Sequence, residues 1–390
     1  MKKVRIAMMH RTKRDAAADV EARWRDVVKR RSFLTGLVTT GAALSTGNLI
    51  GEDNGRRLPK GDVAIIKFLA AAELVESDFW QQYNELGGVD GGNPAYKLAL
   101  ENLDGDMPQY VSDNTDDEMS HAAFLNAYLA SKGEAPVNLD AFRTLPSSRA
   151  TGAKHIGRLT NLMSLNVDTS WYTRYRSTRN PDLNGATFPQ AVNITKQPTI
   201  PLDDKDTPPD QSQPVPPATR QQQRMQAIAN AAAFHFATFD QAGSSVYTNL
   251  ILSVSNPEVL RVLVSILGVE VNHFAVWHDK AGNAVSQPLA GVTDPETGVT
   301  FPDLNSPPFG GEEFQTNLIF PEPCAFINPG FPDCAVIRPS LKQNAGAVAT
   351  ATAIANSQLF QGQSQAFFNA VTALAVAADA ARRDQSGNGE

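Results

Sequence analysis

Two Glu-x-x-His motifs carry the residue types best suited to chemistry in this sequence. Glu118 and His121 form the first motif, Glu270 and His273 form the second, and both lie in apolar surroundings. Residues three positions apart share one face of a helix, so each motif would present a carboxylate beside an imidazole. A buried hydrogen-bonded pair or a solvated helix face would show the same spacing. The presence of two such motifs in apolar segments favours metal ligation.

Two further acidic residues stand where the surrounding pattern asks for apolar side chains. Glu73 lies in the segment AAAELV, and Asp240 follows Phe239 in an equally apolar stretch. An aromatic residue follows each of them after seven positions, Trp80 and Tyr247 respectively. We interpret both aromatic residues as packing residues, with a role beside the ligands as the alternative for Tyr247. Glu73 and Asp240 therefore complete a set of four acidic residues.

Three other acidic or histidine residues near these positions leave the choice of ligands open. Glu76 lies one turn after Glu73 and would replace it as a ligand if the helix had a different phase. His235 lies about one turn before Asp240 and could substitute for it. His235 and His278 are otherwise interpreted as core or surface histidines.

One carboxylate from each of two helices and one Glu-x-x-His motif from each of two others form the ligand set of dinuclear iron and manganese carboxylate proteins. Four carboxylates neutralise two divalent cations, and carboxylate with imidazole suits Fe or Mn. Four buried carboxylates without metal would be costly unless they were protonated or paired with cations. The sequence therefore predicts a dinuclear Fe or Mn site and no catalytic or organic cofactor-binding residues that can be named.

Four long helical segments would position these ligands. The first has Asp62 placed to cap its first turn, and the second begins at a proline that a first helical turn tolerates. Short intervals join the first to the second and the third to the fourth, and a long interval separates the two pairs. The pattern predicts an all-α fold in which two antiparallel hairpins are joined by a crossover, as in one class of four-helix bundle. The expected helices cover residues 62–83, 107–133, 219–252 and 257–280.

The chain is expected to have three parts. Residues 1–46 form an export signal and N-terminal arm, residues 60–281 form the helical bundle, and residues 282–390 form a Pro/Gly-rich extension. The bundle contains a long insertion, 134–217, where little packed structure is expected beyond some local structure around Trp171–Tyr175. The extension ends in an Ala-rich helix over Gln363–Arg382. Its apolar face is expected to pack on the bundle, through Phe367, Phe368, Val371, Leu374 and Val376.

The N-terminus is typical of a twin-arginine export signal. Arg30 and Arg31 are followed by Ser32, Phe33 and Leu34, and then by a weakly apolar run. The pattern predicts that the chain uses the twin-arginine export machinery and reaches the periplasm or the outside of the cell. A basic N-terminal arm is the alternative, and retention of the signal as an anchor stays open. The machinery carries folded proteins, which agrees with a bound metal.

Composition excludes several classes of protein. The formal charge is −7, but residues 1–31 carry a local +7, so the rest of the chain is acidic and would repel a nucleic acid. Two cysteines cannot form an iron–sulfur cluster or a Cys-rich zinc site. Cys324 and Cys334 suit either a disulfide across a short loop or two free thiols. No apolar run is judged long and clean enough for a stable membrane span, and a homo-oligomer is compatible with the pattern.

The order of the motifs and the phrases AAELVESDFW and DEMSHAAFL resemble the ferritin-like superfamily, and most of all its exported members related to plant desiccation-associated proteins. The resemblance covers residues 60–135 and 219–281. It implies a ferritin-like bundle with a dinuclear metal centre. The positions that match are Glu73, Glu118, His121, Glu270 and His273. Asp240 departs from the resemblance because the third helix normally supplies Glu.

Two functions agree with these observations. The first is an exported dinuclear carboxylate protein that reacts with dioxygen or peroxide in oxidative or desiccation stress. The second is a non-catalytic stress-related or envelope structural protein whose metal site is vestigial or structural. Iron storage is less favoured because the long insertion and the extension would fit poorly into a ferritin-like shell.

Overall fold

The computed structural model describes residues 57–174, 188–212, 214–280, 289–308, 330, 332 and 342–383. The chain divides into two units, Met1–Arg56 and Arg57–Glu390, and every described residue belongs to the second. The segment interpreted as an export signal and both cysteines, Cys324 and Cys334, lie outside the described residues.

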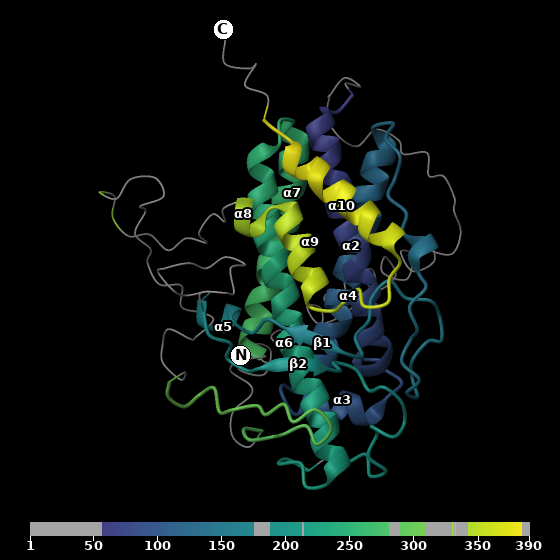
Figure 1. Ribbon diagram of the computed structural model, residues 1–390, viewed down its shortest axis with the longest axis vertical. Helices are drawn as coiled ribbons and strands as arrows, with labels where there is room; N and C mark the ends of the chain where they lie inside the picture. Colours follow the sequence, from purple (N-terminus) through teal and green to yellow (C-terminus); the bar gives the residue numbers. More distant parts are fainter. Residues whose placement is uncertain are drawn as a thin grey trace, which may run out of the picture. The chain divides into compact units, whose positions relative to one another are not determined.

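Helices dominate the described part of the chain, which confirms the all-α class (Figure 1). Four of them are long: α2 (Lys60–Gly87), α4 (Met107–Ser131), α6 (Arg220–Leu250) and α7 (Pro257–His278). They match the four expected segments to within a few residues. The shorter elements are α3 (Pro94–Glu101), α5 (Trp171–Arg174), α8 (Lys342–Ala345), α9 (Ala347–Asn356), α10 (Gln365–Ala380), the 3₁₀ turns η1 (Asp140–Phe142) and η3 (Ile251–Ser253), and the antiparallel strands β1 (Leu165–Val167) and β2 (Ile194–Gln197).

Local signals explain several helix boundaries. Thr219 and Gln222 form a capping box at the start of α6, and the Asn256 side chain accepts hydrogen bonds from the backbone at the start of α7. Gly133, with φ of +77°, follows the end of α4, where a left-handed residue is easiest for glycine.

The expectation that Asp62 caps α2 is wrong. The helix begins at Lys60 without a side-chain cap, so Asp62 already lies inside the first turn. Its carboxylate instead accepts hydrogen bonds from the backbone N–H groups of Ser255 and Asn256, at 2.9 and 2.7 Å. Asp62 therefore joins the start of α2 to the turn between α6 and α7.

The long helices lie side by side, with α2 packed on α4 and α6 packed on α7 (Figure 1). Helices α4 and α7 run in opposite directions along each other. The Trp277 indole donates to Asn114 at one end, and Lys132 pairs with Glu258 at the other. These contacts hold the two Glu-x-x-His helices together.

Each of the four long helices contributes residues to two apolar clusters. One cluster contains Phe79, Trp80 and Phe236, and the other contains Leu69 and Leu263, among many more residues. Along α4, α6 and α7 the predicted ligands fall between the residues of one cluster and those of the other, and on α2 Glu73 lies between Ala71 and Val75, at the edge of the first cluster. The acidic and imidazole side chains thus form a polar layer between two apolar cores.

The insertion between α4 and α6 contains more packed structure than expected. It buries apolar residues such as Leu159, Leu162 and Trp171 in the first cluster, and it forms β1 and β2. The backbone N–H groups of Leu159 and Thr160 donate to Asp78 of α2. Single apolar residues without a periodic pattern anchor this segment, which is why the sequence did not reveal its packing. The expected local structure near Trp171 is the short helix α5.

The C-terminal helices pack on the long helices. Helix α10 lies against α2, α9 lies against α6, and Asp379 of α10 accepts from two backbone N–H groups at the start of α9 (Figure 1). Phe367 is fully buried, as expected, but Val376 is 53% exposed, which corrects its place on the packed face. Phe368, Val371 and Leu374 pack against the clusters. Helices α8 and α9 were not expected because their alanines give no clear amphipathic pattern.

Helix α7 is long and apolar enough to cross a membrane by length and composition alone, and no other helix in the described ranges is. This corrects the expectation that no apolar run reaches that standard. A core helix of a soluble protein passes the same test, and α7 carries Glu270 and His273 on its inner face.

Candidate metal centre

The four long helices bring all six predicted ligand residues into two overlapping groups. The first group is Glu73, Glu118, His121 and Glu270, and the second is Glu118, Asp240, Glu270 and His273. In each group the candidate ligand atoms lie within 4.8 Å of one another. Glu118 and Glu270 belong to both groups, so they stand between two ends that each have one carboxylate and one imidazole.

Both imidazoles turn their Nδ1 atom towards the shared carboxylates. His121 Nδ1 lies 3.1 Å from Glu118 Oε2 and 3.4 Å from both Glu73 Oε2 and Glu270 Oε1. His273 Nδ1 lies 3.0 Å from Glu118 Oε1. The His121 Nδ1 atom, which is surrounded by three carboxylates, occupies the position of a cation, so the geometry of this end suits a positive ion.

Burial raises the pKa of three of the carboxyl groups and so favours their protonated form. Burial raises the pKa of Glu73 to about 8, and it also raises the pKa of Asp240 and of Glu270. The negative charge of Glu118 adds to the increase in each case. These three groups therefore hold protons more tightly than an ordinary carboxylic acid does when no cation neutralises them.

Glu118 behaves in the opposite way. Burial alone would raise its pKa, but hydrogen bonds from His121 and His273 outweigh burial and lower the pKa to about 2. Burial would likewise lower the pKa of His121 and of His273, but their carboxylate partners raise both. Glu118 is thus the ionised centre of the cluster, and the two imidazoles carry the compensating positive charge.

Several buried oxygen atoms of the cluster lack a hydrogen-bond partner among the described residues. They include both carboxyl oxygens of Asp240 and Oε2 of Glu270. Within the same ranges, no lysine or arginine forms an ion pair with any of the six residues. Unpartnered buried carboxylates are costly, and oxygen with imidazole nitrogen is the donor set that Fe and Mn accept. The residues present therefore fit a metal centre.

Three further residues support the cluster, and two of them, Asn114 and Asp117, were not singled out from the sequence. Asn114 donates to Glu118 Oε1 at 2.9 Å and accepts from the Trp277 indole, which fixes the orientation of that carboxylate. The Tyr247 hydroxyl donates to Glu73 Oε1, as in the alternative considered for this residue. Asp117, which is 49% exposed, lies 3.1 Å from His273 Nε2. The spacing of Asn114 and Glu118, four residues apart, was the available signal for the first of these contacts.

The remaining alternatives lie outside both groups. Glu76 is buried on α2 but contributes to neither group, so Glu73 has the phase expected of it. The His235 ring contacts the Tyr83 hydroxyl at 2.8 Å, and burial lowers its pKa to about 3, as for a neutral core histidine. Trp80 stacks on Trp277 with ring centroids 5.4 Å apart. His278 packs against the rings of α5.

Gly243 of α6 touches the cluster closely enough to be tested. A Cβ atom at this position would lie 2.6 Å from Glu270 Oε2. Gly243→Ala is therefore expected to displace Glu270 and to lower the free energy of unfolding by about 1 to 3 kcal/mol. Gly268→Ala on α7 is the matched control, because a Cβ there meets no atom within 4 Å. The control should gain about 0.5 to 1 kcal/mol from helix propensity. Urea unfolding that shows equal gains in both variants would contradict the close contact.

The described residues are mostly helical, and they enclose a buried cluster of carboxylates and histidines. These two features define a helical protein whose interior is compatible with a metal site. A family model described as the ferritin-like domain matches residues 61–283. The chain therefore belongs to the ferritin-like domain family. No curated protein and no solved structure matches it.

Proposed function

We propose that α2, α4, α6 and α7 form a four-helix bundle with a long crossover between α4 and α6, and that its polar layer holds two Fe or Mn ions. The observation that carries this proposal is the pair of overlapping groups that share Glu118 and Glu270. Glu73 and His121 would bind one ion, and Asp240 and His273 would bind the other. Four carboxylates balance the charge of two divalent ions, which no described lysine or arginine does.

The proposed activity is reaction with dioxygen or peroxide, for which Fe or Mn would supply redox chemistry. The chain contributes the surroundings. The apolar clusters on both sides exclude water from the polar layer. Tyr247 and Asn114 orient Glu73 and Glu118. Asp240, which is one methylene shorter than glutamate, would place its ion closer to α6.

The same proposal includes export through the twin-arginine machinery to the periplasm or beyond, and a role in oxidative or desiccation stress. The motif at Arg30 and Arg31 supports the export route. The acidic composition of the chain beyond residue 31 argues against a nucleic-acid partner. Apolar side chains exposed on α4 and α7, such as Phe124 and Val264, would suit a homo-oligomer rather than a membrane span.

A second candidate is a non-catalytic stress-related or envelope protein with a structural metal site. The complete burial of Glu118 and Asp240 favours this candidate, because structural sites are closed and catalytic sites keep an open position. Access to the cluster from solvent therefore separates the two candidates.

Metal analysis tests the proposal. Protein exported by its native host is expected to contain about two Fe or Mn per chain by plasma mass spectrometry, as the ligand set of such proteins implies. The variant with Glu118→Ala and Glu270→Ala should lose both ions, because each ion loses two ligands. A variant with Glu101→Ala and Glu296→Ala, two glutamates outside the cluster, is the matched control and should keep the metal.

The assignment of the ligands would be contradicted if the variant with Glu118→Ala and Glu270→Ala held as much metal as the control with Glu101→Ala and Glu296→Ala. Less than about 0.2 metal per chain in the unmodified protein would contradict the dinuclear centre itself. Circular dichroism of each variant checks that the helices are intact.

A further inference from the structure

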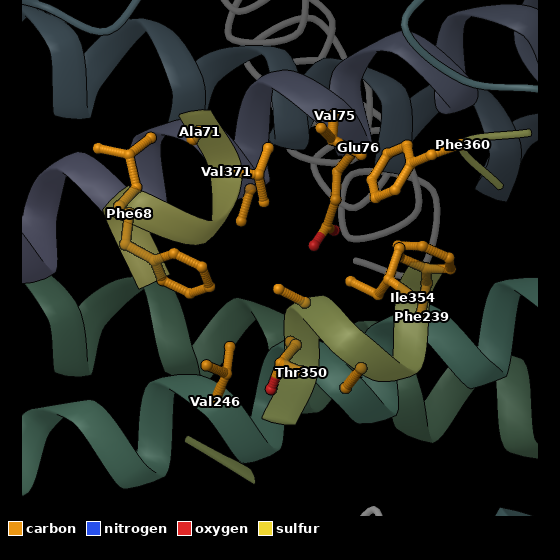
Figure 2. Close-up of a pocket in the computed structure, with 15 residues that line it drawn as sticks. Phe68, Ala71, Val75, Glu76, Phe239, Val246, Thr350, Ile354, Phe360 and Val371 are labelled. Carbon is orange, nitrogen blue, oxygen red and sulfur yellow. The ribbon is translucent and has the colours of Figure 1, made fainter. Parts of the chain in front are cut away.

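A small apolar cavity lies beside the ligand cluster, between the long helices and the C-terminal helices. It has a volume of about 40 Å³ and is lined by residues of α2, α6, α9 and α10 (Figure 2). Its wall includes Phe68, Val75, Phe239, Ile354 and Val371. Helices α9 and α10 lie beyond the residues that the ferritin-like domain model matches, so this cavity is closed by an addition to the family fold.

Two polar atoms without partners face this apolar space. Glu76 points into it from α2, and Thr350 lies on the opposite side, on α9 (Figure 2). Glu76 Oε2 and Thr350 Oγ1 have no hydrogen-bond partner among the described residues, although both side chains are more than nine-tenths buried. Burial raises the pKa of Glu76 well above its usual range, which favours the protonated form of its carboxyl group, and this form can both donate and accept a hydrogen bond. Native proteins rarely leave such groups unpaired, which points to a bound polar molecule.

Gly243 is close to both the cavity and the candidate metal centre. It lines the cavity, and a Cβ on it would lie 2.6 Å from Glu270 Oε2. The absence of a side chain at this position lets the shared carboxylate approach α6 closely. The cavity is thus adjacent to the cluster rather than elsewhere in the core.

A second cavity lies next to the first. It has a volume of about 330 Å³, and Phe239, Ala242 and Ile354 line both cavities. Polar residues of β1, of β2 and of the end of α9 form part of its lining, such as Asn166, Thr195 and Asn356. Asn193 and Asn356 in this wall are exposed, so the outer cavity opens to the surface. The insertion and the C-terminal helices together form its mouth.

We propose that these two cavities form the route by which a small uncharged molecule reaches the ligand cluster, with Glu76 and Thr350 as its last hydrogen-bonding site. The inner volume, about 40 Å³, accepts a molecule of one or two heavy atoms, such as water, dioxygen or hydrogen peroxide. An anion is excluded because the cluster is acidic and the wall apolar. This proposal rests on the proposed function only for what the molecule does when it reaches the cluster.

Xenon tests the cavity without any metal or activity. Crystals of the metal-free full chain under xenon pressure are expected to show a xenon peak between Phe239 and Val371, since dry apolar cavities bind this gas. Ala242→Leu should lower the occupancy at least about fivefold by filling the shared neck. Ala373→Leu, on the exposed face of α10, is the matched control and should leave the peak unchanged. If Ala242→Leu fails to fold, Ile354→Ala should instead raise the occupancy.

The route is contradicted if the unmodified protein shows no xenon at this position, or if Ala242→Leu folds and keeps the peak. Metal content does not enter these results, so they can fail independently of the proposed function.

Metal-loaded protein adds a second readout that separates the two oxidants. Ala242→Leu should slow oxidation of the bound metal by dioxygen and by peroxide at least about tenfold, because it narrows the only neck shared by the two described cavities. Thr350→Val keeps the size of the side chain and removes its hydroxyl, so it should slow the reaction with peroxide only. An unchanged rate in folded Ala242→Leu would overturn the route.

Discussion

Addition of Mn²⁺ to metal-free protein is expected to raise the free energy of unfolding far more at pH 8 than at pH 5.5. Without metal, the folded state holds protons on Glu73, whose pKa burial raises to about 8, and on Asp240 and Glu270, whose pKa values are also raised. The unfolded state loses these protons near pH 4.5. The metal-free protein therefore loses stability as the pH rises from about 4.5 to 8.

Metal reverses this loss, because ligands bind a cation only after they release their protons. Glu118, with its pKa lowered to about 2, is ionised throughout this range and adds no slope. At a concentration of Mn²⁺ a thousandfold above its dissociation constant the gain at pH 8 is about 4 kcal/mol. At pH 5.5 we expect a gain smaller by at least about 1.4 kcal/mol, the equivalent of one pKa unit.

Urea unfolding followed by circular dichroism, with and without MnCl₂ at both pH values, measures these gains. The variant with Glu118→Ala and Glu270→Ala should show no gain at either pH. A gain in the unmodified protein that is equal at both pH values would mean that Mn²⁺ does not displace protons from the buried carboxyl groups.

Glu118→Gln is expected to destabilise metal-free protein at pH 7 by about 3 to 5 kcal/mol, whereas Asp240→Asn should change stability by less than about 1 kcal/mol. Glu118 is ionised, and it compensates the charges of His121 and His273 at 3.1 and 3.0 Å. Its loss leaves two buried imidazolium groups with weaker partners. Burial raises the pKa of Asp240 well above its usual range, and neither of its oxygens accepts a hydrogen bond from a described residue, so a neutral amide of the same shape should replace it at little cost.

The comparison requires protein stripped of metal and unfolded in urea with a chelator present. Asp240→Asn should still weaken metal binding, because it removes one ligand of the second group. Equal destabilisation by both substitutions would show that the charge of the cluster is spread over the carboxyl groups and is not held by Glu118.

The sequence allowed the residues of the buried carboxylate and histidine cluster to be grouped because helical spacing converts directly into geometry. Glu118 and His121 are three residues apart, and residues at this spacing lie on the same face of an α-helix. Glu73 and Asp240 could be predicted for a different reason, because a charge in an apolar pattern indicates a special environment. The four helices followed from the same periodicity, together with caps such as Thr219 and Asn256.

Contacts between distant segments could not be predicted in this way. Asp62 has the sequence features of a helix cap, yet its partners are Ser255 and Asn256, far along the chain. The cavity that Glu76 faces depends on α9 and α10, whose positions no local pattern specifies. The insertion is anchored by isolated residues such as Trp171, and isolated residues leave no period to detect.

The polar layer between the two apolar cores has a consequence for the order of assembly. Each core is complete without the ligands, and the ends of the helices are braced by Asp62 on Ser255 and by Lys280 on Asp104. The scaffold can thus reach its final shape before any ion arrives, with protons held in the layer between the cores. Under the proposed function, the binding of Fe or Mn would then be a late exchange of protons for ions in an already folded protein.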